Sequence, residues 1–133
     1  MDIELDKATE AWRDKARRFV NEALIPWEVE AELNAGELPA EVAAGHRKQA
    51  IELGFSAMDV PADHGGLALG MTAQTAVWEQ LGRVTNALCW CFSEPQQWMF
   101  EACTPAQIET WVLPLMRGRR AVGGIRVPVR SPG

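Results

Sequence analysis

The residue patterns typical of metal binding and acid–base catalysis fit this chain badly. It has two histidines, His46 inside a predicted helix and His64 inside a predicted loop. A di-iron site in a helical bundle needs a glutamate three residues before its histidine, whereas Ala43 and Pro61 occupy those positions. We therefore predict no metal site and interpret His46 as a surface or half-buried side chain. A ligand or base at His64 remains an alternative.

A glycine pair is the next feature that could do chemistry. Gly65 and Gly66 precede a helical pattern, and successive backbone N–H groups before a helix can form an anion-binding nest. Glycine is equally the residue that a turn with positive φ requires. We predict a turn and keep the nest as the alternative. The chain has neither G-x-G-x-x-G nor G-x-x-x-x-G-K, so no nucleotide-binding signature is present.

The cysteines and tryptophans are the remaining side chains that could bind or react. Cys89, Cys91 and Cys103 are odd in number and lack metal-ligand spacing, so we interpret them as reduced, partly buried thiols. Most tryptophans are expected to anchor the core or an interface, and a cluster of exposed ones would mark the surface for a missing partner. The six are Trp12, Trp27, Trp78, Trp90, Trp98 and Trp111.

The elements that must position these residues are helices. Apolar residues recur at three- and four-residue steps along most of the 133-residue chain, which is long enough for one domain with one core. We predict an all-α bundle of five or six helices with an irregular C-terminal tail. The predicted helices cover residues 6–25, 26–33, 39–54, 72–91, 94–102 and 104–118.

Several details of these helices are specific enough to test individually. Leu81 and Leu88 lie one heptad apart and are predicted to be core residues of one long central helix, capped by Thr72. Trp111 is predicted on the buried face of the last helix. Pro114 lies within that helix and should bend its final turn or make it 3₁₀, because proline has no backbone N–H.

Charge is distributed unevenly along the chain, whose net charge is -5. All 18 acidic residues precede residue 117, and the residues that follow carry only basic charges, at Arg117, Arg119, Arg120, Arg126 and Arg130. We therefore divide the chain into a helical domain, 1–118, and a basic tail, 119–133. The acidic body and the lack of a recognition motif argue against nucleic-acid binding.

The composition predicts no membrane span, because no apolar run approaches the ~18 residues that a spanning helix needs. The first residues are acidic and lack the basic-then-apolar pattern of a secretory signal. We therefore expect a cytoplasmic protein.

Four segments occur in an order and at intervals that are together specific. They read F-V-x-x-x-x-I-P at 19–26, A-I-E-L-G-F with V-P and G-G-L within 50–67, W-E-Q-L-G-R at 78–83, and A-C-T-P-A-Q with W-V-L-P-L-M-R-G within 102–118. Over residues 5–118 they resemble the N-terminal helical domain of the acyl-CoA dehydrogenase family.

The resemblance implies a role in FAD-dependent α,β-dehydrogenation of acyl-CoA thioesters, part of fatty acid metabolism. In the family, FAD lies between a central β-domain and a C-terminal helical domain that carries a glutamate base, while the N-terminal domain supplies part of the wall around the acyl chain. The corresponding stretch here is the end of the predicted central helix and the turn after it, which makes Trp90, Phe92, Ser93 and Glu94 the candidates for this substrate wall. The alternative is that Trp90 and Phe92 simply close the core of the bundle.

The sequence departs from the family after Gly118. The family continues with a strand and T-E-P-x-x-G-S-D, whereas residues 119–133 contain neither motif and offer one short strand pattern at 125–127 with nothing to pair with. We therefore expect no catalytic residue and no cofactor-binding residue in this chain, and neither bound FAD nor activity for the chain alone. The tail is interpreted as the remnant of a link to a missing β-domain, as in a truncated or frame-shifted product.

A second hypothesis comes from another functional class. The chain could be a non-catalytic helical interaction module that docks onto a separate flavin-bearing chain. Association with a second copy of itself also stays open.

Overall fold

The computed structural model describes residues 4–119, without the side chains of Asn86 and Ala87, and these residues form helices and no strand. The predicted all-α bundle is confirmed. The strand pattern at 125–127 and nearly all of the predicted tail lie outside the described residues. The α-helices are α1 (Lys7–Phe19), α2 (Glu28–Leu33), α3 (Ala40–Glu52), α4 (Met71–Leu81), α5 (Asn86–Cys89), α6 (Gln97–Ala102), α7 (Pro105–Gln107) and α8 (Leu113–Met116).

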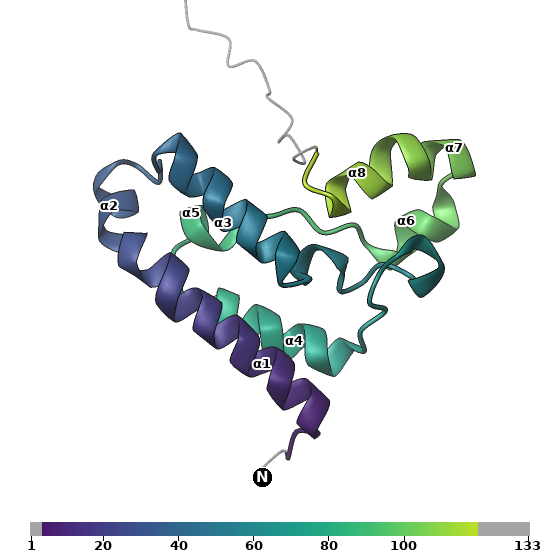
Figure 1. Cartoon of the computed structure of the whole chain (residues 1–133), viewed down its shortest axis with the longest axis horizontal. Coiled ribbons are helices and arrows are strands. Elements are labelled where there is room, and N and C mark those ends of the chain that lie inside the picture. Colours follow the sequence, from purple (N-terminus) through teal and green to yellow (C-terminus); the bar gives the residue numbers. More distant parts are fainter. Residues whose placement is uncertain (1–3, 120–133) are drawn as a thin grey trace, which may run out of the picture.

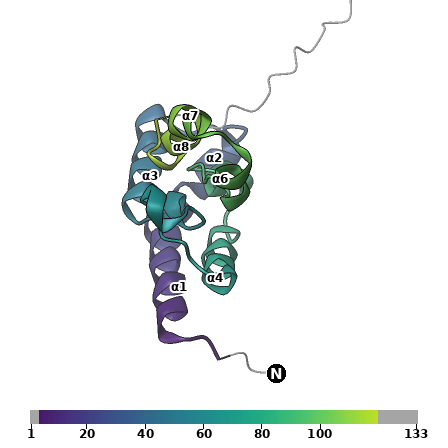
Figure 2. The same cartoon turned by 90° about the vertical axis from the view of Figure 1, so that its right-hand side faces the viewer.

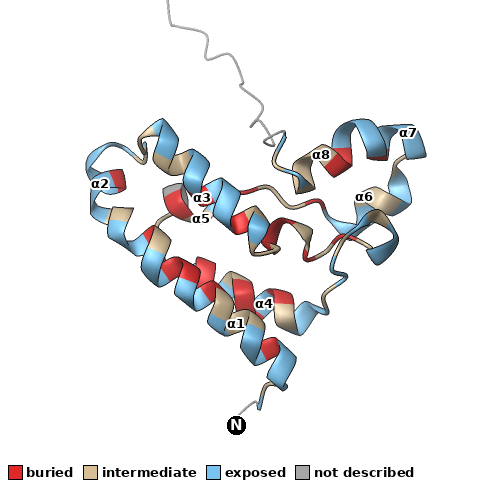
Figure 3. Cartoon of the chain, viewed as in Figure 1, coloured by how far each residue is buried: buried red, intermediate tan, exposed pale blue. Residues whose placement is uncertain are grey.

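The helices form two groups. Figure 1 shows α1 and α4 packed side by side, with α3 opposite them and α6, α7 and α8 gathered at the other end of the molecule. Viewed from that end, α1 and α4 extend below the α6–α8 group as two neighbouring helices (Figure 2). The buried residues lie mainly where α1 and α4 face each other and the interior (Figure 3).

The first helix forms as its pattern predicts. The Asp6 carboxylate accepts a hydrogen bond of 2.8 Å from the Thr9 backbone N–H, which caps the helix start. Its apolar stripe places Ala16, Phe19 and Val20 in the core, each at most 2% exposed. Burial of this stripe stabilises the helix more than its intrinsic propensity does.

Each of the two helix-interrupting prolines follows a stretch of π-helix. Residues Val20–Leu24 are π-helical before Pro26, and Ile108–Val112 are π-helical before Pro114. A proline cannot donate to the carbonyl four residues back and clashes with it, and a wider turn relieves that clash. The widened turn therefore lies upstream of Pro114, and the predicted 3₁₀ final turn was wrong because Leu113–Met116 is α-helical.

The wider turn also corrects the predicted buried face of the last helix. In a π-helical turn residues four to five apart share a face, so Val112 stays in phase with Ile108, whereas Trp111, three positions after Ile108, does not. Ile108 and Val112 are buried as predicted, but Trp111 is 59% exposed. The start of this helix is as predicted, since Thr104 and Gln107 form a capping box with reciprocal side-chain bonds.

The predicted long central helix is two helices. α4 begins after Gly70, not at Thr72, and ends at Leu81, and a turn separates it from α5. The turn is held from outside, because the Glu28 carboxylate accepts a hydrogen bond of 3.2 Å from the Thr85 N–H. Leu81 and Leu88 are nevertheless both fully buried, so the core assignment is confirmed although the continuous helix is not.

The hydrophobic core centres on Phe55, which is fully buried. Its ring centroid lies 5.6 Å from Phe19, 6.1 Å from Phe92 and 6.4 Å from Trp12. Gly54 places Phe55 there by ending α3 with φ of 91°, a left-handed conformation that favours glycine. A smaller cluster under α6–α8 contains Ile108, Val112 and Leu113 with Met99, Phe100, Cys103 and Met116 packed against it.

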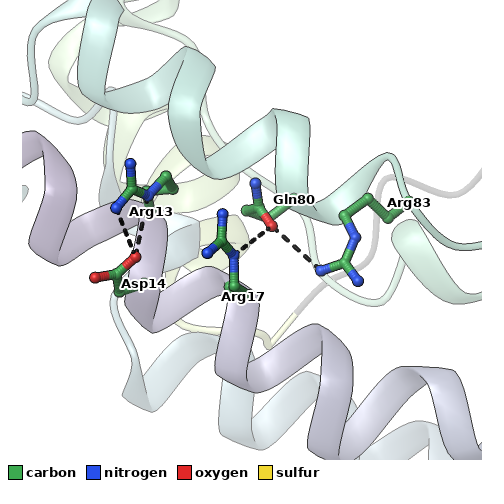
Figure 4. Close-up of polar contacts among 5 residues, drawn as sticks. All are labelled: Arg13, Asp14, Arg17, Gln80 and Arg83. Carbon is green, nitrogen blue, oxygen red and sulfur yellow. Dashed lines mark hydrogen bonds and ion pairs between the residues drawn. The ribbon is translucent and has the colours of Figure 1, made fainter. Parts of the chain in front are cut away.

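A polar contact joins α1 to the end of α4. Gln80, only 5% exposed, uses its Oε1 to accept hydrogen bonds from Arg17 Nε at 3.4 Å and Arg83 Nη1 at 3.2 Å. Figure 4 shows these three side chains meeting, with the neighbouring ion pair between Arg13 and Asp14. The contact satisfies a buried amide that the helix packing would otherwise leave unpaired.

Ser56 links the two helix groups and gives the first prediction. Its buried hydroxyl donates a hydrogen bond of 2.7 Å to the Met116 carbonyl at the end of α8. Ser56→Ala removes this buried donor from the Met116 carbonyl, and we expect the free energy of unfolding to fall by about 1–2 kcal/mol in denaturant titrations. Thr75→Ala removes a similar but exposed hydroxyl bond to Met71 and should change stability by less than about 0.5 kcal/mol. Equal losses for the two variants would show that Ser56 does not join the groups.

Candidate functional site

One hollow lies beside the connection between α5 and α6. This Trp90 pocket has a volume of about 340 Å³ and contains residues from α3, from α4 and from the connection. It is lined by Arg47, Trp78, Trp90, Cys91, Phe92, Ser93, Glu94 and Gln96. The four substrate-wall candidates from the sequence therefore line one cavity, and contact with an acyl chain stays a prediction.

Aromatic packing holds the connection in place. Phe92 is 6% exposed and stacks on Trp78 of α4, with centroids 5.6 Å apart and an interplanar angle of 26°. Trp90 is 73% exposed at the same pocket. Phe92 thus joins the pocket to the main core through Phe55, while Trp90 has a large apolar surface still open to solvent.

Glu94 is the unusual electrostatic feature of the Trp90 pocket. Its Oε1 is buried and has no hydrogen-bond partner among the described residues. Burial raises the pKa of the carboxyl group from 4.5 to about 7, and the nearby Asp59 charge adds to the rise. The Asp59 backbone and the Trp78 side chain oppose the rise by hydrogen bonding to the carboxylate. Near neutral pH, Glu94 therefore exists in both protonation states.

Asp59 hydrogen-bonds to Glu94 through its backbone and was not identified from the sequence. Its carboxylate accepts hydrogen bonds from Gln74 Nε2 at 3.0 Å and from the Gln97 backbone N–H at 2.8 Å. The first bond reaches α4, and the second holds the start of α6, three residues later than the start at residue 94 that the sequence predicts. No local sequence signal marks this role, since Asp59 lies 38 residues before Gln97.

The raised pKa of Glu94 predicts how stability depends on pH. In the unfolded chain this carboxyl has its usual pKa near 4.5, so between about pH 4.5 and 7 the folded state binds more protons. The stability contributed by protonated Glu94 is complete below about pH 4.5 and is lost as the pH rises through 7. Glu94→Gln should therefore unfold at a higher temperature than the native chain above pH 7, with the difference shrinking toward pH 4.5.

The control for this pH dependence is Glu101→Gln, which removes an exposed carboxyl from α6. Across the same pH range, the melting temperature of this variant should change in parallel with that of the native chain. A Glu94→Gln curve that also stays parallel would contradict the assigned burial of Glu94.

The other sequence candidates have structural roles. Gly65 and Gly66 use their N–H groups within the loop, bonded to the Ala62 and Pro61 carbonyls at 3.0 and 3.1 Å, so neither is left for an anion. The turn interpretation is confirmed, with φ of 81° at Gly65. The His64 ring packs on Phe100 with centroids 4.9 Å apart.

His46 corrects one prediction. It is 6% exposed and so belongs to the interior rather than the surface, and burial lowers the pKa of its imidazole. Its position in phase with Ala50, the other buried residue of α3, was the sequence signal for this. Within residues 4–119, no group of three or more His, Cys, Asp or Glu side chains is placed to hold a metal ion.

The cysteines have the environment expected of structural thiols. Burial raises the pKa of the Cys91 thiol to about 12, so it is protonated at neutral pH. A protonated thiol is a poor nucleophile and a poor metal ligand. All three cysteines are partly buried and none forms a disulfide, as the sequence predicted.

Comparison with protein families gives one match, which covers most of the chain. The family model for the acyl-CoA dehydrogenase N-terminal domain matches residues 6–119. The chain belongs to this family. Searches of curated proteins and of solved structures found no match.

For an acyl-CoA dehydrogenase N-terminal domain, the helical architecture is as expected, and the match spans α1 to the end of α8. It includes the whole Trp90 pocket. Among the described helices none is long and apolar enough to cross a membrane.

Proposed function

We propose that residues 1–118 form the N-terminal domain of a flavoprotein that dehydrogenates acyl-CoA thioesters, with the Trp90 pocket as part of the wall around the acyl chain. The observation that carries this proposal is the pocket itself. The four residues that the family resemblance selects line one hollow, with Trp78 and Phe92 supplying apolar surface. The location of the protein in the cytoplasm remains a prediction from the sequence.

The polar chemistry of the reaction is assigned to other parts of such a flavoprotein. The described residues offer no nucleotide-binding loop, since the N–H groups of Gly65 and Gly66 are used internally. FAD would supply the hydride acceptor and a base elsewhere would take the α-proton. This domain would orient the acyl chain and exclude water from it. We propose that residues 119–133 belong to the link that follows this domain.

Mapping of acyl ligands on the isotopically labelled chain tests the pocket. Acyl thioesters of N-acetylcysteamine are suitable probes because they retain the thioester and have no ionisable group. We expect amide shift changes centred on Cys91, Phe92 and Ser93, weakened when Trp90 is replaced by Ala. Shift changes confined to other surfaces, or none at any soluble concentration, would contradict the proposed wall.

A flavin-binding measurement tests whether the flavin site lies outside this domain. After incubation with FAD and gel filtration, the chain should elute without flavin absorbance, because the proposal places the flavin site in other domains. Stoichiometric flavin in the protein peak would overturn this assignment.

The alternative function is a helical module that docks onto a flavin-bearing chain. The exposed indoles of Trp90, Trp98 and Trp111, each at least 59% exposed, favour an additional contact surface. Co-purification of a protein with a flavin spectrum, lost on replacing Trp98 and Trp111 by Ser, would favour this alternative over a covalently linked β-domain.

A further inference from the structure

Glu94 is placed where an apolar occupant would change its protonation. The carboxyl lines the Trp90 pocket together with Trp78, Trp90 and Phe92, and its Oε1 has no hydrogen-bond partner among the described residues. An apolar group that fills the pocket would displace water from around Glu94 without supplying a donor. Burying a charged carboxylate is costly unless it is paired, so the neutral acid would be favoured.

We infer that occupation of the Trp90 pocket by an uncharged acyl group is coupled to proton uptake by Glu94, about half a proton per ligand at most for a shift of about one unit. The inference rests on the proposed function, because it takes the acyl chain as the occupant. The proton comes from solvent, and no covalent bond forms or breaks. Glu94 thereby acts as a positioning and selectivity residue, which favours uncharged acyl groups over those that carry a carboxylate.

The charges around the pocket are consistent with this coupling. Asp59, on the loop between α3 and α4, acts in both directions, because its backbone N–H donates a hydrogen bond to the Glu94 carboxylate while its charge disfavours that carboxylate. Arg47 of α3 lines the same pocket, but it is not among the groups that shift the pKa of Glu94. The Cys91 thiol is neutral, and α4 contributes only the hydrogen bond from Trp78. Among the described residues, no cation therefore lowers the pKa of Glu94 in the empty pocket.

The size of the effect follows from the linkage between binding and protonation. Glu94 has a pKa of about 7 in the empty pocket. A further rise of about one unit on ligand binding weakens affinity about five- to tenfold between about pH 6 and 8.5. A larger rise in the pKa of Glu94 on ligand binding would cause a larger loss of affinity with pH.

The experiment measures the affinity of the folded chain for octanoyl N-acetylcysteamine, which has no charge, across that pH range. We expect the Kd to rise about five- to tenfold with pH in the native chain and to stay flat in Glu94→Gln. Glu101→Gln is the matched control and should keep the native dependence. Calorimetry of the native chain in two buffers of different ionisation enthalpy counts the protons taken up, and gives an answer even if Glu94→Gln folds poorly.

The outcomes separate the inference from the proposed function. Binding with a flat pH dependence and no proton uptake would overturn the inference and leave the acyl wall intact. A pH dependence that persists in folded Glu94→Gln would assign the proton to another group and also overturn it. Absence of binding at every pH would contradict the acyl wall itself.

Discussion

Gly66→Ala is expected to prevent the chain from folding stably. A methyl group added at Gly66 would overlap the Val60 carbonyl oxygen and Cβ, and neither belongs to the far end of a flexible side chain. The loop between α3 and α4 would have to separate, breaking bonds such as Ala68 N–H to Val60 O at 3.0 Å. We expect a loss of at least about 3–5 kcal/mol, visible as lost cooperative unfolding.

Two neighbouring glycines provide matched controls for this result. A methyl group at Gly65 meets no atom within 4 Å, so Gly65→Ala costs only the strain of φ at 81°, about 1–2 kcal/mol. Gly70 is equally open and has φ of -64°, so Gly70→Ala should be within about 0.5 kcal/mol of the native chain. A Gly66→Ala variant as stable as Gly65→Ala would show that the loop is not packed against Val60.

Leu81→Ala should produce the second large effect. Leu81 is fully buried where α4 ends against α1, and its truncation leaves a cavity that the surrounding helices cannot fully close. The expected loss in the free energy of unfolding is about 2–5 kcal/mol, measured by denaturant or thermal unfolding.

Glu79→Ala is the control on the same helix, because Glu79 is exposed. It should shift stability by less than about 0.5 kcal/mol. If Leu81→Ala and Glu79→Ala had the same melting temperature, the face of α4 assigned to the core would be wrong.

Periodicity in the sequence was sufficient for the helices and for most of the core. Phe19, Val77 and Leu88 are buried as their spacing indicates. The break between α4 and α5 was missed because residues on both sides of the turn face the same core, so the apolar spacing continues across it. The residue that holds this turn, Glu28, lies 57 positions away from Thr85, and no local pattern carries that information.

The candidate site could be predicted only in part. Family resemblance selected the contiguous stretch that contains Trp90 and Glu94, but it could not supply Arg47 or Asp59, which reach the same region from other elements. The protonation behaviour of Glu94 was also inaccessible, because it depends on burial and on its distance from Asp59. Such properties arise from tertiary structure.

The separation of the small cluster under α6–α8 from the main core has a consequence for motion. Among the described residues, its buried centre contains Ile108, Val112 and Leu113, and specific bonds such as Ser56 to Met116 and Asp59 to Gln97 attach it to the rest. Segments with few buried contacts open locally at lower free energy than the global unfolding of a domain. The α6–α8 unit should therefore exchange its amide hydrogens before α1 and α4 do. The Trp90 pocket ends where α6 begins. A ligand bound there would therefore slow the amide exchange of the α6–α8 unit and couple its unfolding to that of the main core.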